Sequence, residues 1–191
     1  MSTPKILAFS GSSRKDSFNQ RLIENAARAA EDAGAEVRLI QLRDFPMPIM
    51  DQDLESEQGQ PENGTRLKQL FIDHDCIMIA SPEYNSSISP LLKNAIDWVS
   101  RKVGDEPPLV AYKGKVAAIM SASPGRLGGL RGLVHVRSIL GNLGMLVLPD
   151  QLAVSSAMKA FDEHGGLTND SDRDRLQQIT SRLIDVSTRL R

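Results

Sequence analysis

The sequence predicts one doubly wound α/β domain spanning residues 1–191, in which a five-stranded parallel sheet lies between two layers of helices. Apolar runs of strand length alternate along the chain with amphipathic segments of helix length, and this alternation implies right-handed crossovers and a parallel sheet. The strand-like runs are apolar without strict alternation, as expected of strands that are covered on both faces. We see neither an internal repeat nor a second core.

Short apolar runs indicate the strands. Residues 76–80 (CIMIA) are apolar throughout, whereas Val37 and Leu39 alternate with polar residues in another run, and both patterns are typical of strands. The predicted strands cover residues 6–9, 36–42, 76–80, 115–120 and 145–148, with a further piece of the last strand at 152–154.

A period near 3.6 residues indicates the helices. In residues 19–33 the apolar side chains share one face, and Gly34 then provides a stop signal. Further helices are predicted at residues 66–72, 90–103, 127–143 and 172–190. The segment 43–65 contains three prolines and is predicted to be a long loop, which is unusual in a compact domain and often functional.

The composition excludes several classes of partner. The chain has 23 basic and 24 acidic residues and a net charge of −1, so no general field draws it to nucleic acid. A single cysteine, Cys76, excludes an internal disulfide framework. The longest apolar runs are about five residues, against the roughly 20 needed to span a bilayer, and the N-terminus lacks the pattern of a secretory signal. We therefore expect a cytoplasmic protein without nucleic-acid or membrane partners.

A loop rich in hydrogen-bond donors follows the first predicted strand. Residues 10–19 read SGSSRKDSFN and lead directly into a helix. The backbone N–H groups of such a turn and the positive end of the helix dipole favour an anion, to which hydroxyls, an amide and the Arg14 guanidinium add donors and a charge. The loop therefore predicts a phosphate site. The alternative is an ordinary helix start capped by Ser17 or Asp16.

The composition of this loop favours a terminal phosphate. A dinucleotide-binding turn needs G-x-G-x-x-G, but only Gly11 is present, and Ser13 and Asp16 stand at the other two positions. The triphosphate-binding motif G-x-x-x-x-G-K-[ST] is also absent. A turn that is rich in side-chain donors suits a phosphomonoester with several oxygens, such as the tail of FMN.

Two further loops leave the same edge of the predicted sheet. Residues 81–86 (SPEYNS) offer a carboxylate, an aromatic ring and an amide, the mixture that a flat heteroaromatic ring needs. The alternative is a strand-to-helix loop capped by Ser86, Ser87 or Ser89, with Pro90 in the first helical turn.

The third loop, residues 121–129 (SASPGRLGG), contains small residues that let a ligand or another chain approach the backbone. A flexible turn is the alternative. Because Ser10, Ser81 and Ser121 each follow their own predicted strand, we expect the three loops to meet at the carboxyl edge of the sheet, where ligands bind in this architecture.

Other catalytic chemistries find no support in the sequence. His74-Asp75-Cys76 lacks the spacing of metal ligands, and Cys76 begins an apolar strand, so a structural thiol is favoured. There is no G-x-S-x-G elbow, and the three histidines show no triad pattern. We expect neither a bound metal nor a side chain that acts as a catalytic acid or base.

Three motifs together resemble the NADPH-dependent FMN reductase family, which has a flavodoxin-like fold and includes quinone, chromate and azo-dye reductases. They are residues 10–19, SPEYN at 81–85 and LKNAIDW at 92–98, and the resemblance covers about residues 5–155. It implies FMN as cofactor, NADPH or NADH as reductant, and a homodimer or homotetramer with flavin sites near the subunit contacts. The family's common glycine after Arg-Lys is Asp16 here, which should point away from the phosphate or cap the helix.

The resemblance also implies which residues bind the cofactor. The first loop would hold the phosphate, the second would line the isoalloxazine ring and the ribityl chain, and the third would close the remaining side. The implied residues are Ser12, Arg14, Ser17, Phe18 and Asn19 in the first loop, Pro82, Glu83, Tyr84 and Asn85 in the second, and Ser121 or Ser123 in the third.

The predicted function is transfer of two electrons from NAD(P)H through FMN to a small acceptor, with quinones, chromate, azo compounds and free flavin as candidates. The flavin carries the chemistry and the protein orients it. One alternative is a non-enzymatic flavodoxin-type electron carrier, although such carriers are usually strongly acidic and this chain is close to neutral. Another is a flavin-regulated interaction subunit, which would bind FMN with negligible turnover.

The apolar residues of the segment 44–64 indicate a contact between subunits. It contains Phe45, Ile49 and two methionines, which a solitary domain gains little by exposing. We therefore expect at least a dimer, with this segment near the partner's flavin site. Trp98 could extend the same surface, although a tryptophan at its position is more often part of the core.

Overall fold

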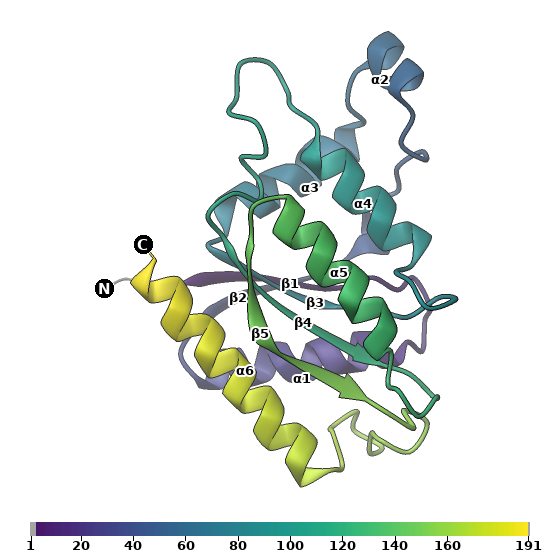
Figure 1. The fold of residues 1–191 in the computed structure, drawn as a ribbon, viewed down its shortest axis with the longest axis vertical. Helices are drawn as coiled ribbons and strands as arrows, with labels where there is room; N and C mark the ends of the chain where they lie inside the picture. The colour runs from purple at the N-terminus through teal and green to yellow at the C-terminus, as the bar shows by residue number, and fades with distance from the viewer. Residues whose placement is uncertain (1–2, 191) are drawn as a thin grey trace.

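The computed structural model describes residues 3–190, and its centre is one parallel sheet (Figure 1). The strands are β1 (Lys5–Ser10), β2 (Glu36–Gln41), β3 (Cys76–Ala80), β4 (Val116–Ala122) and β5 (Leu146–Val154). They lie in the order β2-β1-β3-β4-β5, and every neighbouring pair is parallel. The predicted five-stranded doubly wound sheet is confirmed.

Helices cover both faces of the sheet and give the predicted three layers (Figure 1). One face carries α1 (Phe18–Asp32) and α6 (Asp170–Arg189). The other carries α3 (Glu62–Asp73), α4 (Pro90–Ser100) and α5 (Leu130–Asn142). A short helix, α2 (Gln52–Gln58), and a single 3₁₀ turn, η1 (Leu42–Asp44), lie on the connection from β2 to α3.

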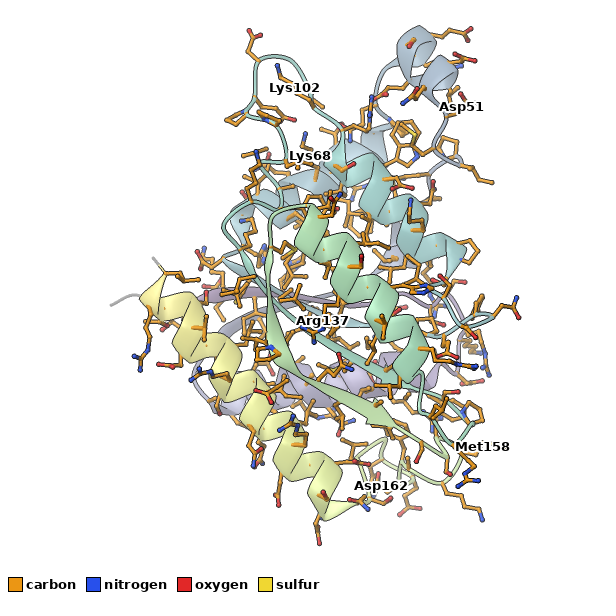
Figure 2. All side chains as sticks on the ribbon, viewed as in Figure 1. Asp51, Lys68, Lys102, Arg137, Met158 and Asp162 are labelled. Carbon is orange, nitrogen blue, oxygen red and sulfur yellow. The ribbon has the colours of Figure 1, made fainter. Side chains whose placement is uncertain are left out.

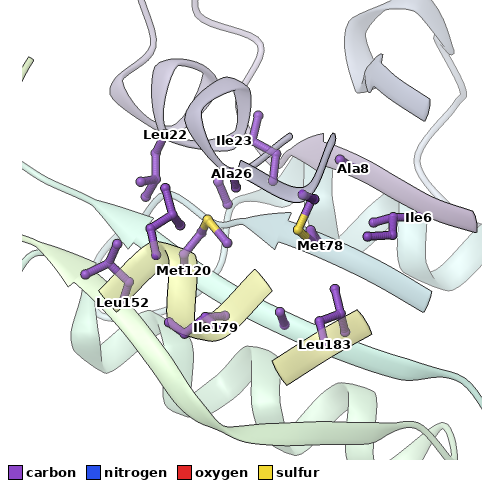
Figure 3. Close-up of a cluster of buried hydrophobic side chains, with 14 of the residues drawn as sticks. Ile6, Ala8, Leu22, Ile23, Ala26, Met78, Met120, Leu152, Ile179 and Leu183 are labelled. Atoms are coloured by element: carbon purple, nitrogen blue, oxygen red, sulfur yellow. The ribbon is translucent and has the colours of Figure 1, made fainter. Parts of the chain in front are cut away.

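The core has two halves because successive strand residues point to opposite faces of a sheet. Ile6 and Ala8 of β1 face α1 and α6, whereas Leu7 and Phe9 face the other helix layer. Figure 3 shows the first half, in which side chains from α1 and α6 meet those of the strands. All five residues of β3 are buried, as the apolar run at 76–80 predicts.

The prediction of one long loop over residues 43–65 is wrong in part. Helix α2 lies within it, and α3 starts at Glu62 rather than at residue 66. Asp51 caps α2 by accepting hydrogen bonds from the backbone N–H groups of Asp53 and Leu54 at 2.8 and 3.4 Å. No residue of α2 is buried, so the helix leaves no apolar periodicity in the sequence.

Several other boundaries differ from their predicted positions. Helix α4 ends at Ser100 rather than at residue 103, and β4 continues to Ala122. Helix α5 begins three residues later than predicted, because Gly128 and Gly129 have φ angles of +61° and +90° that are incompatible with a helix. The two predicted pieces of the last strand form one strand, β5, whose pairing with β4 shifts register around Pro149, a residue without a backbone donor.

The segment 44–64 packs against α4 more closely than its predicted role as an exposed surface implies. The indole N–H of Trp98 donates to the carbonyl of Pro48 at 2.8 Å, and Trp98 is fully buried. Phe45 is also buried, whereas 85% of Ile49 is exposed. Trp98 therefore belongs to the core, and Ile49 is the one large apolar side chain that this segment exposes among the residues described.

Helix α2 and the loop after α4 project from the same end of the molecule, where Figure 2 labels Asp51 and Lys102. An ion pair between Arg101 and Glu55 joins the two, with 2.7 Å between Nη2 and the carboxylate. Lys68, buried on α3, makes an ion pair with Glu106 and so fixes the loop after α4. Within residues 3–190, no helix is both long and apolar enough to cross a membrane.

Candidate functional site

The three predicted loops come together at the carboxyl ends of β1, β3 and β4. A pocket lies between them. Its lining residues are Ser12, Arg14, Ser17, Phe18, Asn19, Pro82, Glu83, Tyr84, Ala122, Ser123 and Pro124. Of the predicted binding residues, only Asn85 and Ser121 are absent from this lining, and Ala122 and Pro124 are additions that the motifs did not indicate.

Two serines in the first loop keep their hydroxyl protons available for a ligand. Ser17 is the N-cap of α1, and its Oγ accepts from the backbone N–H of Gln20 at 3.3 Å. The Oγ of Ser12 accepts from the backbone N–H of Arg14 at 3.2 Å. Because each hydroxyl is used here as an acceptor, its single proton can still be donated to an anion.

Arg14 supplies the positive charge at this end of the pocket. Its guanidinium carbon lies 6.0 Å from the centre of the Phe18 ring, and that ring stacks on Phe161 at 6.3 Å with an interplanar angle of 7°. Phe161 thus supports the Phe18 ring, and the Arg14 guanidinium lies over this apolar surface. Asp16 is exposed and does not line the pocket, as expected if it points away from an anion, and Ser17 rather than Asp16 caps the helix.

Asn19 joins the first loop to the third. Its Nδ2 donates to the carbonyl of Ala122, and its Oδ1 accepts from the backbone N–H of Ala122, both at 2.9 Å. The side chain is 4% exposed. The amide oxygen and one of the two Nδ2 hydrogens are therefore paired with Ala122, so Asn19 lines the pocket and fixes its width, and one side-chain N–H is left as a donor.

The second loop forms a tight turn that presents Tyr84. Tyr84 and Ser87 exchange two backbone hydrogen bonds of 2.9 and 3.0 Å across the turn. The two residues between them, Asn85 and Ser86, have φ angles of +50° and +67°, as in the hairpin turns that need positive φ at both central positions. Tyr84 is 47% exposed at the rim of the pocket, and Asn85 lies on the turn outside the lining.

Glu83 points to the start of α5 instead of offering a free acceptor to a ligand. Its Oε1 accepts from Nε and Nη2 of Arg131 at 3.1 and 2.8 Å, and its Oε2 accepts from the backbone N–H of Gly132 at 3.0 Å. Burial tends to raise the pKa of this carboxyl, but the hydrogen bond from Gly132 and the Arg131 guanidinium outweigh it, so that its pKa lies below the ordinary value of 4.5.

The third loop contributes Ser123, whereas Ser121 lies elsewhere. Ser121 belongs to β4, is fully buried, and its Oγ faces Gly129 without a hydrogen-bond partner among residues 3–190. A Cβ atom on Gly129 would collide with Ser121 Oγ and lie 2.8 Å from Ser121 Cβ. The glycine that the sequence suggests for ligand approach thus permits the close contact between α5 and β4.

The donors and the charge in the pocket fit a phosphomonoester. The start of the 15-residue helix α1, two hydroxyls with available protons and one guanidinium all lie on the side of the pocket that the first loop lines, and helix starts of this kind bind anions. At the other end, Tyr84 and Pro82 offer flat and apolar surfaces. The fold defines the class, a flavodoxin-like α/β protein, and the chemistry of this pocket suits a phosphorylated planar ligand.

Comparison with known proteins identifies the family. The model of the NADPH-dependent FMN reductase family matches residues 4–159, and the chain belongs to this family. It is an oxidoreductase that uses FMN and NAD(P)H. A non-enzymatic electron carrier is accordingly not the favoured interpretation.

Two relatives illustrate the match along the sequence. An NAD(P)H-dependent FMN reductase of Pseudomonas aeruginosa is 36% identical over 176 residues, which cover 91% of this chain and 90% of that protein. An NADPH:quinone oxidoreductase of Arabidopsis thaliana is 33% identical over 189 residues, which cover 97% and 93% respectively.

Solved structures agree with the observed fold. The flavoenzyme NAD(P)H:(acceptor) oxidoreductase of Paracoccus denitrificans superimposes with a TM-score of 0.83 at 26% identity, covering 98% of each chain. An archaeal flavodoxin superimposes with a TM-score of 0.61 at 10% identity, covering 96% of this chain and 99% of the other. The second likeness shows the fold alone.

Proposed function

We propose that the pocket between the first, second and third loops is the FMN site. The phosphate is held by Arg14, the hydroxyls of Ser12 and Ser17 and the start of α1, while Pro82 and Tyr84 flank the isoalloxazine ring. The convergence of three loops from distant parts of the chain on one pocket carries this assignment. Phe18, Asn19 and Ser123 shape the pocket. Glu83 holds the turn that carries Tyr84 against α5.

We further propose that the acceptor is a small molecule of the quinone type. Bound FMN supplies the redox chemistry, accepting hydride from NAD(P)H and passing two electrons to the acceptor. The protein would bind the phosphate and orient the ring, with the half-exposed Tyr84 beside it. No side chain is required as an acid or base. Relatives named for quinones, in plants and bacteria, support this substrate class.

The test combines a spectrum with a turnover assay. Purified protein supplied with FMN should show a bound-flavin spectrum and should oxidise NADPH rapidly only when a benzoquinone is also present. Bound flavin without quinone-dependent NADPH oxidation, or turnover with other acceptors alone, would refute the quinone assignment. Absence of any bound flavin would refute the site itself.

A homodimer or homotetramer completes the proposal. The projecting α2 and the exposed Ile49 offer a surface that a second copy can cover. We also propose that residues 1–191 form a single domain, which the one continuous sheet within the described residues 3–190 supports.

A further inference from the structure

The turn that carries Tyr84 is held at both ends by α5. At one end, both oxygens of Glu83 are engaged by Arg131 and Gly132. At the other, the Ser87 hydroxyl and Nδ1 of His135 are hydrogen-bonded at 2.8 Å. A Cβ on Gly132 would lie 3.2 Å from the Ser87 carbonyl and 3.3 Å from Glu83 Cβ, so the helix backbone packs directly on both ends of the turn.

The turn itself needs such support. Asparagine tolerates the left-handed conformation, but Ser86 at φ +67° adopts it at a cost in energy. A backbone held in a sparsely populated region persists when its surroundings determine it. The hydrogen bonds from α5 supply those surroundings, and they do so from residues that do not line the pocket, namely Arg131, Gly132 and His135.

We propose that Glu83 is a positioning residue, whose carboxylate fixes the Tyr84 turn to α5 through Arg131 and thereby sets the orientation of Tyr84 beside the flavin. This inference rests on the proposed FMN site. It differs from the role that the family resemblance implies, in which Glu83 itself binds the flavin: Glu83 borders the pocket, but only 9% of its side chain is exposed and both oxygens are occupied.

Opposite charges on the two partners make the proposal testable. If Glu83 acted on the flavin through its charge, Glu83→Gln would leave an unpaired guanidinium and raise the flavin midpoint potential. Arg131→Gln would leave an unpaired carboxylate and lower it. If Glu83 instead positions the turn, both variants release the same contact, and their effects have the same direction.

The experiment measures two quantities in Glu83→Gln, Arg131→Gln and the double variant, each saturated with FMN. They are the rate of flavin reduction by NADPH in stopped flow and the midpoint potential. We expect the reduction rate to fall about tenfold in each single variant, since small displacements of an orienting group are costly. The reduction rate of the double variant should be within about twofold of that of the slower single variant, because both substitutions remove the same contact.

A conservative variant and a control complete the design. Arg131→Lys retains the charge but places its donors on a single nitrogen, and it should restore part of the lost rate. Arg126→Gln removes a similar exposed charge from the preceding loop, where Arg126 has no ion pair within residues 3–190, and should reduce flavin at the wild-type rate. Because 60% of the Arg131 side chain is exposed, we expect its replacement to leave the fold intact, as thermal melts can verify.

The proposal would be overturned by midpoint potentials that move in opposite directions, by additive losses in the double variant, or by melting temperatures that fall while reduction rates stay unchanged. A failure of the FMN site itself has a different signature. In that case Tyr84→Ala would leave the bound-flavin spectrum unchanged. If Tyr84→Ala alters the spectrum but the Glu83 and Arg131 variants behave like the wild type, the site stands and this inference alone falls.

Discussion

At the scale of single residues, Arg14 is the one full positive charge in the lining of the pocket. Replacing it with alanine should weaken FMN binding by about 1.5–3 kcal/mol, the range for a hydrogen bond to a charged group. Riboflavin, which lacks the phosphate, should bind almost as before. Titration of both ligands by flavin fluorescence measures the difference, and Lys15→Ala, which removes an adjacent charge outside the lining, is the matched control. Equal weakening of the two ligands would contradict a phosphate contact.

Tyr84 tests the other end of the pocket. We expect Tyr84→Ala to change the visible spectrum of bound FMN and to slow flavin reduction, because the ring loses an aromatic neighbour. Tyr84→Phe keeps that ring and should preserve both properties. Spectra and stopped-flow rates of the three proteins decide the question, and wild-type behaviour of the alanine variant would place the flavin ring elsewhere.

The lowered pKa of Glu83 has a consequence for stability in acid. A carboxyl whose pKa is lower in the folded than in the unfolded protein stabilises the fold above its unfolded pKa, about 4.5 here. That contribution disappears as the pH falls through the folded pKa. The difference in free energy of unfolding between wild type and Glu83→Gln should therefore be largest near neutral pH and shrink below pH 4.5. Urea unfolding across this range checks the trend, which a constant difference would contradict.

At the scale of elements, two glycines of the α5 region should respond oppositely to alanine. Gly129 has a φ of +90°, and its new Cβ would collide with Ser121, so Gly129→Ala should destabilise the protein by about 2 kcal/mol or more. Gly141 lies within the helix with nothing near its Cβ position, so Gly141→Ala should stabilise by about 0.5–1 kcal/mol. Thermal or urea unfolding measures both changes, and similar effects at the two positions would contradict the described contact.

The elements also show what the sequence can and cannot predict. Both boundaries of strand β3 were predicted correctly, because a strand that is buried on two faces has apolar residues throughout. Helix α2 was not, since its stability comes from the Asp51 cap and the Arg101–Glu55 ion pair rather than from a buried face. Within the site, the residues next to the strand ends were predictable from the loop motifs.

The contacts that orient the side chains of the site join residues far apart in the chain, and no pattern in the local sequence indicates them. Arg131 is 48 residues from Glu83 and Ala122 is 103 residues from Asn19, so no spacing in the sequence relates them. Ser121 was misplaced because pairing with β5 extends β4 by two residues beyond the predicted end. Phe161, which supports Phe18 from the loop after β5, was missed for the same reason as the other distant partners.

At the scale of the whole molecule, we expect self-association. Ile49 is 85% exposed beside the acidic helix α2, and an interface there should bury about 1,200 Å² or more in total. Light scattering at micromolar concentration should give at least twice the monomer mass of 20.9 kDa, and Ile49→Asp should reduce it. A monomer with full activity would contradict the expectation.

The paired amide of Asn19 has a consequence for the order of folding. Its partner Ala122 is 103 residues away at the end of β4, so the first and third loops acquire their relative position only after β1, β3 and β4 have assembled. Contacts of such sequence separation cost loop-closure entropy before they form. The N–H of Ala122 should therefore exchange with solvent deuterium only when the sheet opens, and its exchange rate would report whether the pocket is assembled before any flavin is added.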